Sequence, residues 1–251
     1  MESKKVSGAP KAVVVGGSIA GLSCAHALIS AGWQVTVIEK SSAAPSGSPT
    51  GAGLALDPQS VEIVGRWISN PDLVREITLP LPIDLGKSMT LKASDDMIQR
   101  MIEEAEKVWV PELAKVMKET KQPFINVIYD ADPPTKLFWD KVVLVGDAAH
   151  PVVPNGARST NMSIQDAETL GLCLKKWGLE DLADALREFQ TIRHPVITKQ
   201  VLHSRLMGLL RQGLPLQDNT AFDPKAASPE ECERLQFRNM PYFEHGAPTC
   251  I

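Results

Sequence analysis

Residues 12–21 read Ala-Val-Val-Val-Gly-Gly-Ser-Ile-Ala-Gly, and they predict how the chain begins to fold. The first four of these residues form an apolar, mostly β-branched run, which is typical of a central parallel strand covered on both faces. Apolar residues then recur at helical spacing from Ile19 to Ile29, and Gly32 suits a helix C-cap. Residues 35–39 predict a second strand. The order strand, glycine turn, helix and strand predicts a βαβ unit with a right-handed crossover.

The glycine turn lies where a dinucleotide fingerprint must lie, directly after the first strand and at the start of the first helix. Gly16 permits the tight turn, and Gly21 lets the helix and the strand pack closely. Ser18 departs from the fingerprint because it occupies the position of the second glycine, although its hydroxyl can donate to a phosphate. The free N–H groups of the first helical turn predict a pyrophosphate site, while the turn alone leaves a non-nucleotide role open. The predicted contacts are Gly16, Gly17, Ser18, Ala20 and Gly21.

Glu39 strengthens the nucleotide interpretation. It ends the second predicted strand eighteen residues after Gly21, where a carboxylate accepts hydrogen bonds from both hydroxyls of an adenosine ribose. The same carboxylate repels a 2′-phosphate, so the pattern favours FAD or NAD over NADP as the tightly held nucleotide. Glu39 and the following Lys40 are therefore included among the predicted cofactor-binding residues.

A second motif follows the apolar run of residues 142–145. Residues 146–151 read Gly-Asp-Ala-Ala-His-Pro, and residues 154–156 read Pro-Asn-Gly. This stretch, with Asn161, resembles the second FAD motif of the flavin-dependent aromatic hydroxylases. The resemblance implies that Asp147 binds the ribityl chain, that Pro151 lies beside the isoalloxazine ring, and that backbone N–H groups near Ser159 face the pyrimidine end of the flavin. Residues 51–54 also resemble that family. The cofactor-binding residues implied here are Gly53, Gly146, Asp147, Pro151, Gly156, Ser159, Thr160 and Asn161.

General physical chemistry supports these roles. A reduced flavin carries negative charge, and the helix predicted to begin near Asn161 offers unpaired N–H donors and the positive end of its dipole. His150 is adjacent to Pro151 in a turn, so we expect a positional or backbone-bonding role for it rather than general-base chemistry. No catalytic residue and no metal ligand is assigned.

The elements predict an α/β fold, a Rossmann-like FAD/NAD(P)-binding parallel sheet flanked by helices. Residues 1–85 would form the first half of the FAD-binding domain, residues 86–141 a shortened substrate-side insertion, residues 142–212 the second half with the C-terminal helices, and residues 213–251 an extended tail. Ser94 is expected to cap one helix, Pro111 to open another, and residues 124–129 to form a strand. Residues 142–145 predict a buried strand, residues 161–177 a helix, and residues 179–212 a long helical stretch kinked or broken at Pro195.

The chain departs from the hydroxylases between its two motifs. It is much shorter there than such enzymes require, and it contains no Asp-Gly dipeptide, a motif that in those enzymes lies near FAD and the nicotinamide cofactor. The character of the amino-acid sequence changes abruptly near residues 86–88, and this change resembles a junction left by deletion or alternative splicing. If so, the walls that exclude water from the flavin are reduced.

The composition of the chain limits the kinds of partner that we expect it to bind. The net charge of −4 gives no reason to expect nucleic acid, no apolar run reaches bilayer length, and the four cysteines show no metal-ligand spacing. We therefore expect a cytoplasmic protein that acts on a small molecule and can form a homodimer. The resemblance implies an FAD-dependent oxidoreductase in which NAD(P)H reduces the flavin and the reduced flavin activates oxygen. The alternatives are a flavoenzyme adapted to oxidation or redox-neutral rearrangement, and a non-catalytic isoform acting as a binding or dimerisation module.

Overall fold

The computed structural model describes residues 8–40, 56–68, 90–92, 94–120, 124–126, 128–156, 158–216, 223 and 225–234. The elements fall into two compact units. The larger unit contains both sequence motifs, and the smaller one contains β3, β4, α4 and α5. Of the expected features, residues 51–54 with Gly53, and the junction at residues 86–88, lie outside the described residues.

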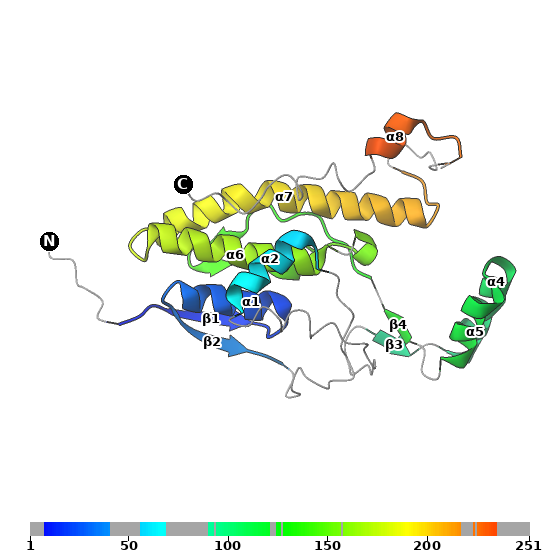
Figure 1. Cartoon of the computed structure of the whole chain (residues 1–251), viewed down its shortest axis with the longest axis horizontal. Helices are drawn as coiled ribbons and strands as arrows, with labels where there is room; N and C mark the ends of the chain where they lie inside the picture. Colours follow the sequence, from blue (N-terminus) through cyan, green and yellow to red (C-terminus); the bar gives the residue numbers. More distant parts are fainter. Residues whose placement is uncertain are drawn as a thin grey trace. The chain divides into compact units, whose positions relative to one another are not determined.

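The first elements of the larger unit form the predicted βαβ unit. Strand β1 (Lys11–Val15) pairs in parallel with β2 (Gln34–Ile38), and α1 (Ile19–Ser30) connects them. Figure 1 shows α1 lying along the two strands. Gly32, at φ +87°, follows the helix as the left-handed residue that the sequence predicts for its C-terminus.

The expectation that this strand is covered on both faces is wrong. Val14 is buried beneath the helices, whereas Val13 and Val15 are 62% and 84% exposed and point to the other face. Ile38, the partner of Val15 in the parallel pair, is also exposed. The β-branched run therefore predicts the strand correctly, but it does not predict what covers each face of that strand.

Helix α6 (Ser159–Trp177) packs between α1 and α7 (Leu182–Arg211), and α2 (Pro58–Trp67) packs on α6 (Figure 1). The packing of α1 on α6 depends on small residues, because a Cβ on Gly171 would lie 3.0 Å from the Cβ of Ala27. The core between these elements contains Val14, Leu28, Leu137, Met162, Leu170, Phe189 and Ile197, among others.

Helix α7 continues through Pro195, so the expected break is absent. Proline removes only one hydrogen bond of the ladder, and the surrounding residues Val196, Ile197 and Val201 are buried, so tertiary packing maintains the helix. The short helix α8 (Pro229–Arg234) lies within the segment for which the sequence suggested an extended tail.

Residues 142–145 form less strand than expected. Only β6 (Val142–Val143) is regular, and it pairs antiparallel with β5 (Phe138–Trp139). Val142 is 61% exposed, which contradicts the buried strand that the apolar run predicts. Two short 3₁₀ turns follow, η1 (Gly146–Ala148) and η2 (Pro154–Gly156).

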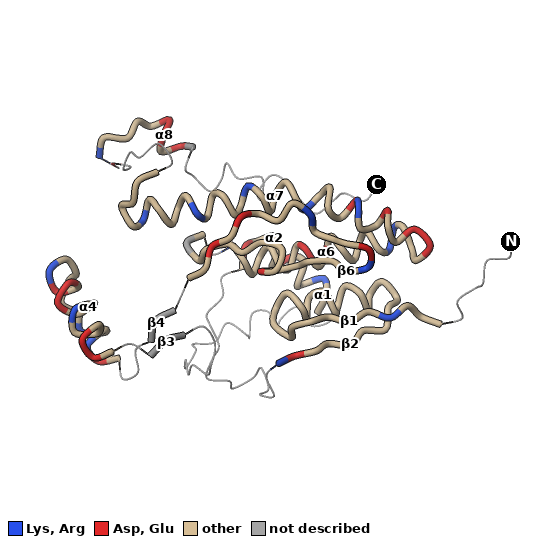
Figure 2. The backbone as a smooth tube through the Cα atoms, turned by 180° about the vertical axis from the view of Figure 1, so that it is seen from behind, with Lys and Arg blue, Asp and Glu red and all other residues tan. Residues whose placement is uncertain are grey.

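The smaller unit is a helical hairpin with a short strand pair. Helix α4 (Asp95–Val108) begins at Ser94, whose hydroxyl accepts from the N–H of Met97, and α5 (Pro111–Glu119) begins at its proline, both as predicted. Strand β3 (Thr90–Lys92) pairs antiparallel with β4 (Phe124–Asn126), which ends before the expected position 129. Figure 2 shows acidic and basic residues interspersed along α4.

Candidate functional site

The turn between β1 and α1 has the geometry that its glycines require. Gly16 adopts φ +104°, a left-handed conformation that favours glycine, and its N–H donates to the carbonyl of Ile38 at 2.8 Å. A Cβ on Gly21 would lie 1.8 Å from the carbonyl oxygen of Gly16, so no other residue fits there without moving the backbone. The turn is therefore fixed by close packing of the helix on the strand.

The N-terminus of α1 is open to a ligand. Ser18 is the N-cap residue, but its side chain makes no capping hydrogen bond, and the first turn carries no acidic residue. Apart from its chain neighbours, no atom of the described residues lies within 4 Å of the position a Cβ would take on Gly16. Backbone donors at the positive end of a helix beside open space are the features that hold a phosphate group. These residues fit the pyrophosphate of a dinucleotide.

Glu39 lies beside the same turn. One of its carboxylate oxygens accepts a hydrogen bond from the N–H of Gly17 at 2.6 Å, and both Glu39 and Lys40 are exposed. A Cβ on Gly17 would approach the Glu39 side chain to 3.1 Å. The structure thus brings the predicted ribose-binding carboxylate to the glycine turn.

The second motif packs directly against the first. Gly146 adopts φ +62°, and a Cβ on it would lie 2.5 Å from the Cβ of Ala20 in α1. The N–H groups of Ala149 and His150 both donate to the carbonyl of Gly146, at 2.8 and 2.9 Å, and close the turn. Residues more than 120 positions apart in the sequence therefore form one continuous surface.

The N-terminus of α6 borders this turn. The hydroxyl of Ser159 donates to the carboxylate of Asp147, which is exposed. The helix has no side-chain cap and no acidic residue in its first turn, so it offers a second set of backbone donors. Pro151, Gly156 and Thr160 are half-buried in the same part of the unit.

Asn161 has a different role from its neighbours. It is buried, and its Oδ1 accepts from the N–H of Asp57 at 2.9 Å, while Asp57 caps α2 by accepting from the N–H of Ser60 at 2.7 Å. The Asn161 side chain thus joins α2 to α6. Arg158, which precedes the helix, has a pKa lowered by burial, an effect that the charge of Asp57 opposes.

Sequence reasoning missed a buried cluster beneath the second motif. Asp166, on α6, is fully buried, and its Oδ1 accepts from Nε of Arg193 at 2.8 Å. Its Oδ2 accepts from the N–H of Gly146 at 3.0 Å and lies 2.9 Å from Nε2 of His150. Burial raises the pKa of Asp166, but the charges of Arg193 and His150 and their hydrogen bonds outweigh it, so the pKa is below its usual range. An ionised carboxylate only accepts, so Nε2 of His150 is the donor.

The position of His150 supports a positional role. Its side chain is fully buried, and its carbonyl accepts from the N–H of Val152 at 2.7 Å. Within the described residues, the His, Cys, Asp and Glu side chains form no group of three that could hold a metal ion.

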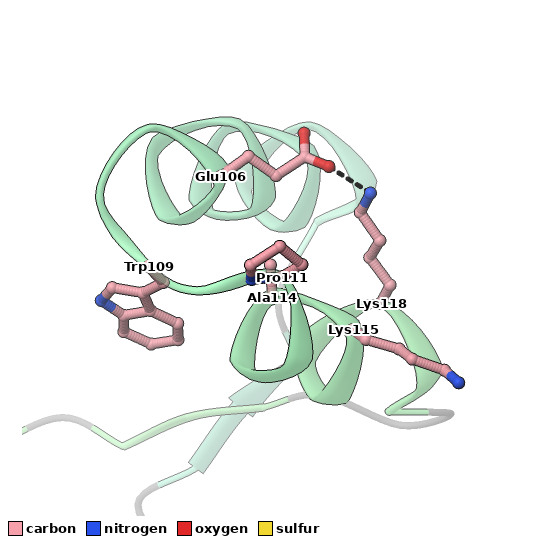
Figure 3. A pocket seen from close by; sticks show the side chains of 6 residues that line it. All are labelled: Glu106, Trp109, Pro111, Ala114, Lys115 and Lys118. Atoms are coloured by element: carbon pink, nitrogen blue, oxygen red, sulfur yellow. Dashed lines mark hydrogen bonds and ion pairs between the residues drawn. The ribbon is translucent and has the colours of Figure 1, made fainter.

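Two clefts lie away from the motifs. One, of about 340 Å³, lies in the α4–α5 hairpin, where the ion pair of Glu106 and Lys118 borders Trp109 and Pro111 (Figure 3). The other, of about 210 Å³, lies between α1, α2 and α6 and includes His26 and Trp67, whose ring centroids are 5.1 Å apart. No helix in the described part of the chain has both the length and the apolar character needed to span a bilayer.

Comparison with known proteins identifies the relatives. A family model described as FAD binding domain matches residues 101–204, and one described as FAD dependent oxidoreductase matches residues 11–120. The chain is 38% identical over 79 residues to 3-hydroxybenzoate 6-hydroxylase of Klebsiella oxytoca, covering 32% of this chain and 20% of that protein. It is 32% identical over 88 residues to 3-amino-4-hydroxybenzoate 2-monooxygenase of Streptomyces cremeus, covering 35% and 22%. Over about a third of its length, the chain is similar in sequence to these FAD-dependent aromatic monooxygenases.

The FAD-dependent monooxygenase fold is also seen among solved structures. HpxO of Klebsiella pneumoniae, solved with FAD and uric acid, superposes with a TM-score of 0.60 at 15% identity, covering 81% of this chain and 89% of that one. At this identity the likeness shows the fold alone. The alignments span about a fifth of the length of the two relatives named above. Because both are monooxygenases or hydroxylases, the two alternative functions considered from the sequence are not favoured.

Proposed function

We propose that this chain binds one FAD non-covalently and acts as an NAD(P)H-dependent monooxygenase on a small aromatic or unsaturated molecule. The observation that carries the proposal is the contact of Gly146 with Ala20, because it places the two motifs side by side. Two uncapped helix N-termini then border one surface. When bound, FAD would supply electron transfer from NAD(P)H and activation of oxygen.

Each end of the cofactor has residues that suit it. The N–H groups at the start of α1, with Gly16, Gly17, Ser18, Ala20 and Gly21, would hold the pyrophosphate, and Glu39 with Lys40 would lie at the adenosine ribose. Asp147 would bind the ribityl chain. Pro151, Gly156 and the backbone of Ser159, Thr160 and Asn161 would lie at the flavin ring, where the α6 dipole stabilises negative charge. Gly53 remains a predicted contact outside the described residues.

The reaction is expected to be poorly coupled. The insertion between the motifs is short, and no Asp-Gly dipeptide is present to contact the reductant. Oxygen transfer to a substrate requires a site from which water is excluded, so a small insertion favours release of hydrogen peroxide. The domain boundaries, the cytoplasmic location and the homodimer expected from the sequence stay predictions.

Two measurements test the proposal. The purified protein should release FAD on denaturation, or bind added FAD in a fluorescence titration with a stoichiometry of one. NAD(P)H consumed, peroxide formed and hydroxylated product should then be compared across a panel of phenolic substrates. Absence of FAD binding would overturn the proposal. If the amount of hydroxylated product equals the amount of NAD(P)H consumed, with negligible peroxide, the proposed function stands. The short insertion is then enough to exclude water from the site.

A further inference from the structure

Histidines apart, Asp166 and Arg193 are the two ionisable acidic and basic residues that the described core contains. Asp166 has no exposed surface, and the Arg193 side chain is 6% exposed. Burial of a carboxylate is strongly unfavourable unless other groups neutralise it and satisfy its oxygens. An apolar pair of similar size would fill the same space without this penalty. The buried charge therefore calls for an explanation beyond packing.

The carboxylate is satisfied by donors from three different parts of the chain. Arg193 comes from α7, His150 from the turn before Pro151, and Gly146 donates through its backbone N–H. Oδ1 is taken by the guanidinium and Oδ2 by the other two groups. Because Nε of Arg193 holds Oδ1 while the Gly146 N–H and His150 hold Oδ2, these donors together fix the orientation of the carboxylate.

Oδ2 accepts from the N–H of Gly146, the residue that forms the turn of the second motif. Gly146 is in the left-handed region, its carbonyl closes the turn through two further hydrogen bonds, and its Cα faces Ala20 of α1. Asp147, the next residue of this turn, is exposed and accepts a hydrogen bond from Ser159 at the start of α6. Movement of the Gly146 peptide would therefore move Asp147 and Pro151 together.

We propose that Asp166, acting through Gly146 and His150, is the positioning residue that sets the orientation of Asp147 and Pro151 for the flavin half of the cofactor, with Arg193 fixing the carboxylate. This inference rests on the proposed FAD binding. Asp166 does not touch the surface where FAD would lie. Its effect is transmitted by the hydrogen bond to the Gly146 N–H and by the buried imidazole beside Pro151.

Two variants test this role at different strengths. Asp166→Asn keeps the shape but leaves one acceptor oxygen in place of two, so Gly146, His150 and Arg193 cannot all be satisfied. Arg193→Lys keeps the charge but loses the Nε–H donor that contacts Oδ1. We expect the dissociation constant for FAD to rise at least tenfold in Asp166→Asn and by a smaller factor in Arg193→Lys, with an altered visible circular dichroism band of the bound flavin in both.

Leu174→Ala is the matched control. Leu174 is a buried residue of the same helix, eight positions after Asp166 and about 12 Å along the axis, so its truncation destabilises the core away from the motif. We expect it to lower the melting temperature but to leave the flavin spectrum and affinity close to those of the unmodified chain. Hydrogen exchange without FAD gives a second measurement, in which Asp166→Asn should accelerate exchange at the Gly146 amide at least tenfold more than at the α6 core amides.

The outcomes separate the two proposals. If the unmodified chain binds no FAD, the proposed function and the cofactor role of Asp166 both fail. If the unmodified chain binds FAD, and Asp166→Asn behaves as Leu174→Ala does in affinity, spectrum and exchange, Asp166 is a stabilising residue only and the positioning role is wrong. Should Asp166→Asn fail to fold, an Arg193→Lys protein with unchanged affinity and an unchanged flavin spectrum contradicts it equally.

Discussion

The position that a Cβ atom would take on Gly146 lies 2.5 Å from the Cβ of Ala20, which is closer than two carbon atoms can pack. Gly146 begins the second motif, and Ala20 lies in the first turn of α1. The absence of a side chain at Gly146 therefore permits the two halves of the proposed cofactor site to meet.

Gly146→Ala should destabilise the chain more than a change of backbone conformation alone. A left-handed alanine costs about 1–2 kcal/mol, and overpacking adds roughly 1–3 kcal/mol. Gly213→Ala is the matched control, because Gly213 has a similar φ of +63° at the C-terminus of α7 and, apart from its chain neighbours, no described atom lies within 4 Å of the added Cβ. Denaturant unfolding measures both. Adding Ala20→Gly to the Gly146→Ala variant should recover part of the lost stability. An equal loss of stability in Gly146→Ala and in its control variant would contradict the contact between Gly146 and Ala20.

Glu39→Ala should weaken FAD binding by about 1–3 kcal/mol, the usual size of charge-assisted hydrogen bonds. The variant also removes the acceptor that contacts the Gly17 N–H. Glu62→Ala serves as the control, since Glu62 is an exposed acid paired with Arg66 on α2. Fluorescence titration gives both affinities. Unchanged binding in Glu39→Ala would remove the assignment of the ribose contact.

Asp166 should make stability depend on pH under acidic conditions. Its pKa is held below its usual range, chiefly by Arg193 and then His150 acting against burial. The carboxylate therefore contributes stability that is fully present above about pH 3.9, the unfolded value, and is lost as the pH falls through the lower folded value. Unfolding free energies measured between pH 2 and 6 should show this loss in the unmodified chain and a smaller loss in Asp166→Asn. If the unfolding free energies of the two proteins change with pH in parallel, the assignment of this pH dependence to Asp166 is wrong.

Cys24 should be inert towards thiol reagents in the folded protein. Burial, and then the negative charge of Asp166, raise its pKa to about 12, so at pH 8 a fraction on the order of 10⁻⁴ is thiolate, the reactive form. Cys232 is exposed and should react at once. Alkylation followed by peptide mass spectrometry distinguishes the two, and addition of denaturant should release Cys24. Rapid labelling of Cys24 in the native protein would show that α1 opens easily.

The elements that could be predicted are those whose signals are local. Ser94 marks a helix start through its capping hydroxyl and Pro111 through its fixed φ, and the glycine turn after residues 12–15 marks the βαβ unit. Coverage of β1 could not be predicted in the same way, because the exposure of Val13 and Val15 depends on which elements pack above them and not on the strand sequence.

The buried cluster could not be predicted from composition, since an acid in a helix is usually on the surface. Its partner Arg193 lies 27 residues later in another helix. One sequence signal was present. Asp166 follows Met162 by four positions and precedes Leu170 by four, so it lies on the apolar face of α6, where all three are buried. An acid within an apolar stripe indicates a buried partner.

The close approach of Ala27 and Gly171 has a consequence for the order of folding. Helices α6 and α7 are joined by residues 178–181 and can associate early, because little chain entropy is lost when a short loop closes. The contact of α1 with α6 closes a loop of 144 residues, so we expect the N-terminal βαβ unit to dock after the rate-limiting step. Ala27→Gly should then speed unfolding with little effect on the folding rate, and the two arms of a chevron plot would separate these effects. The pyrophosphate half and the flavin half of the proposed site would thus come together last.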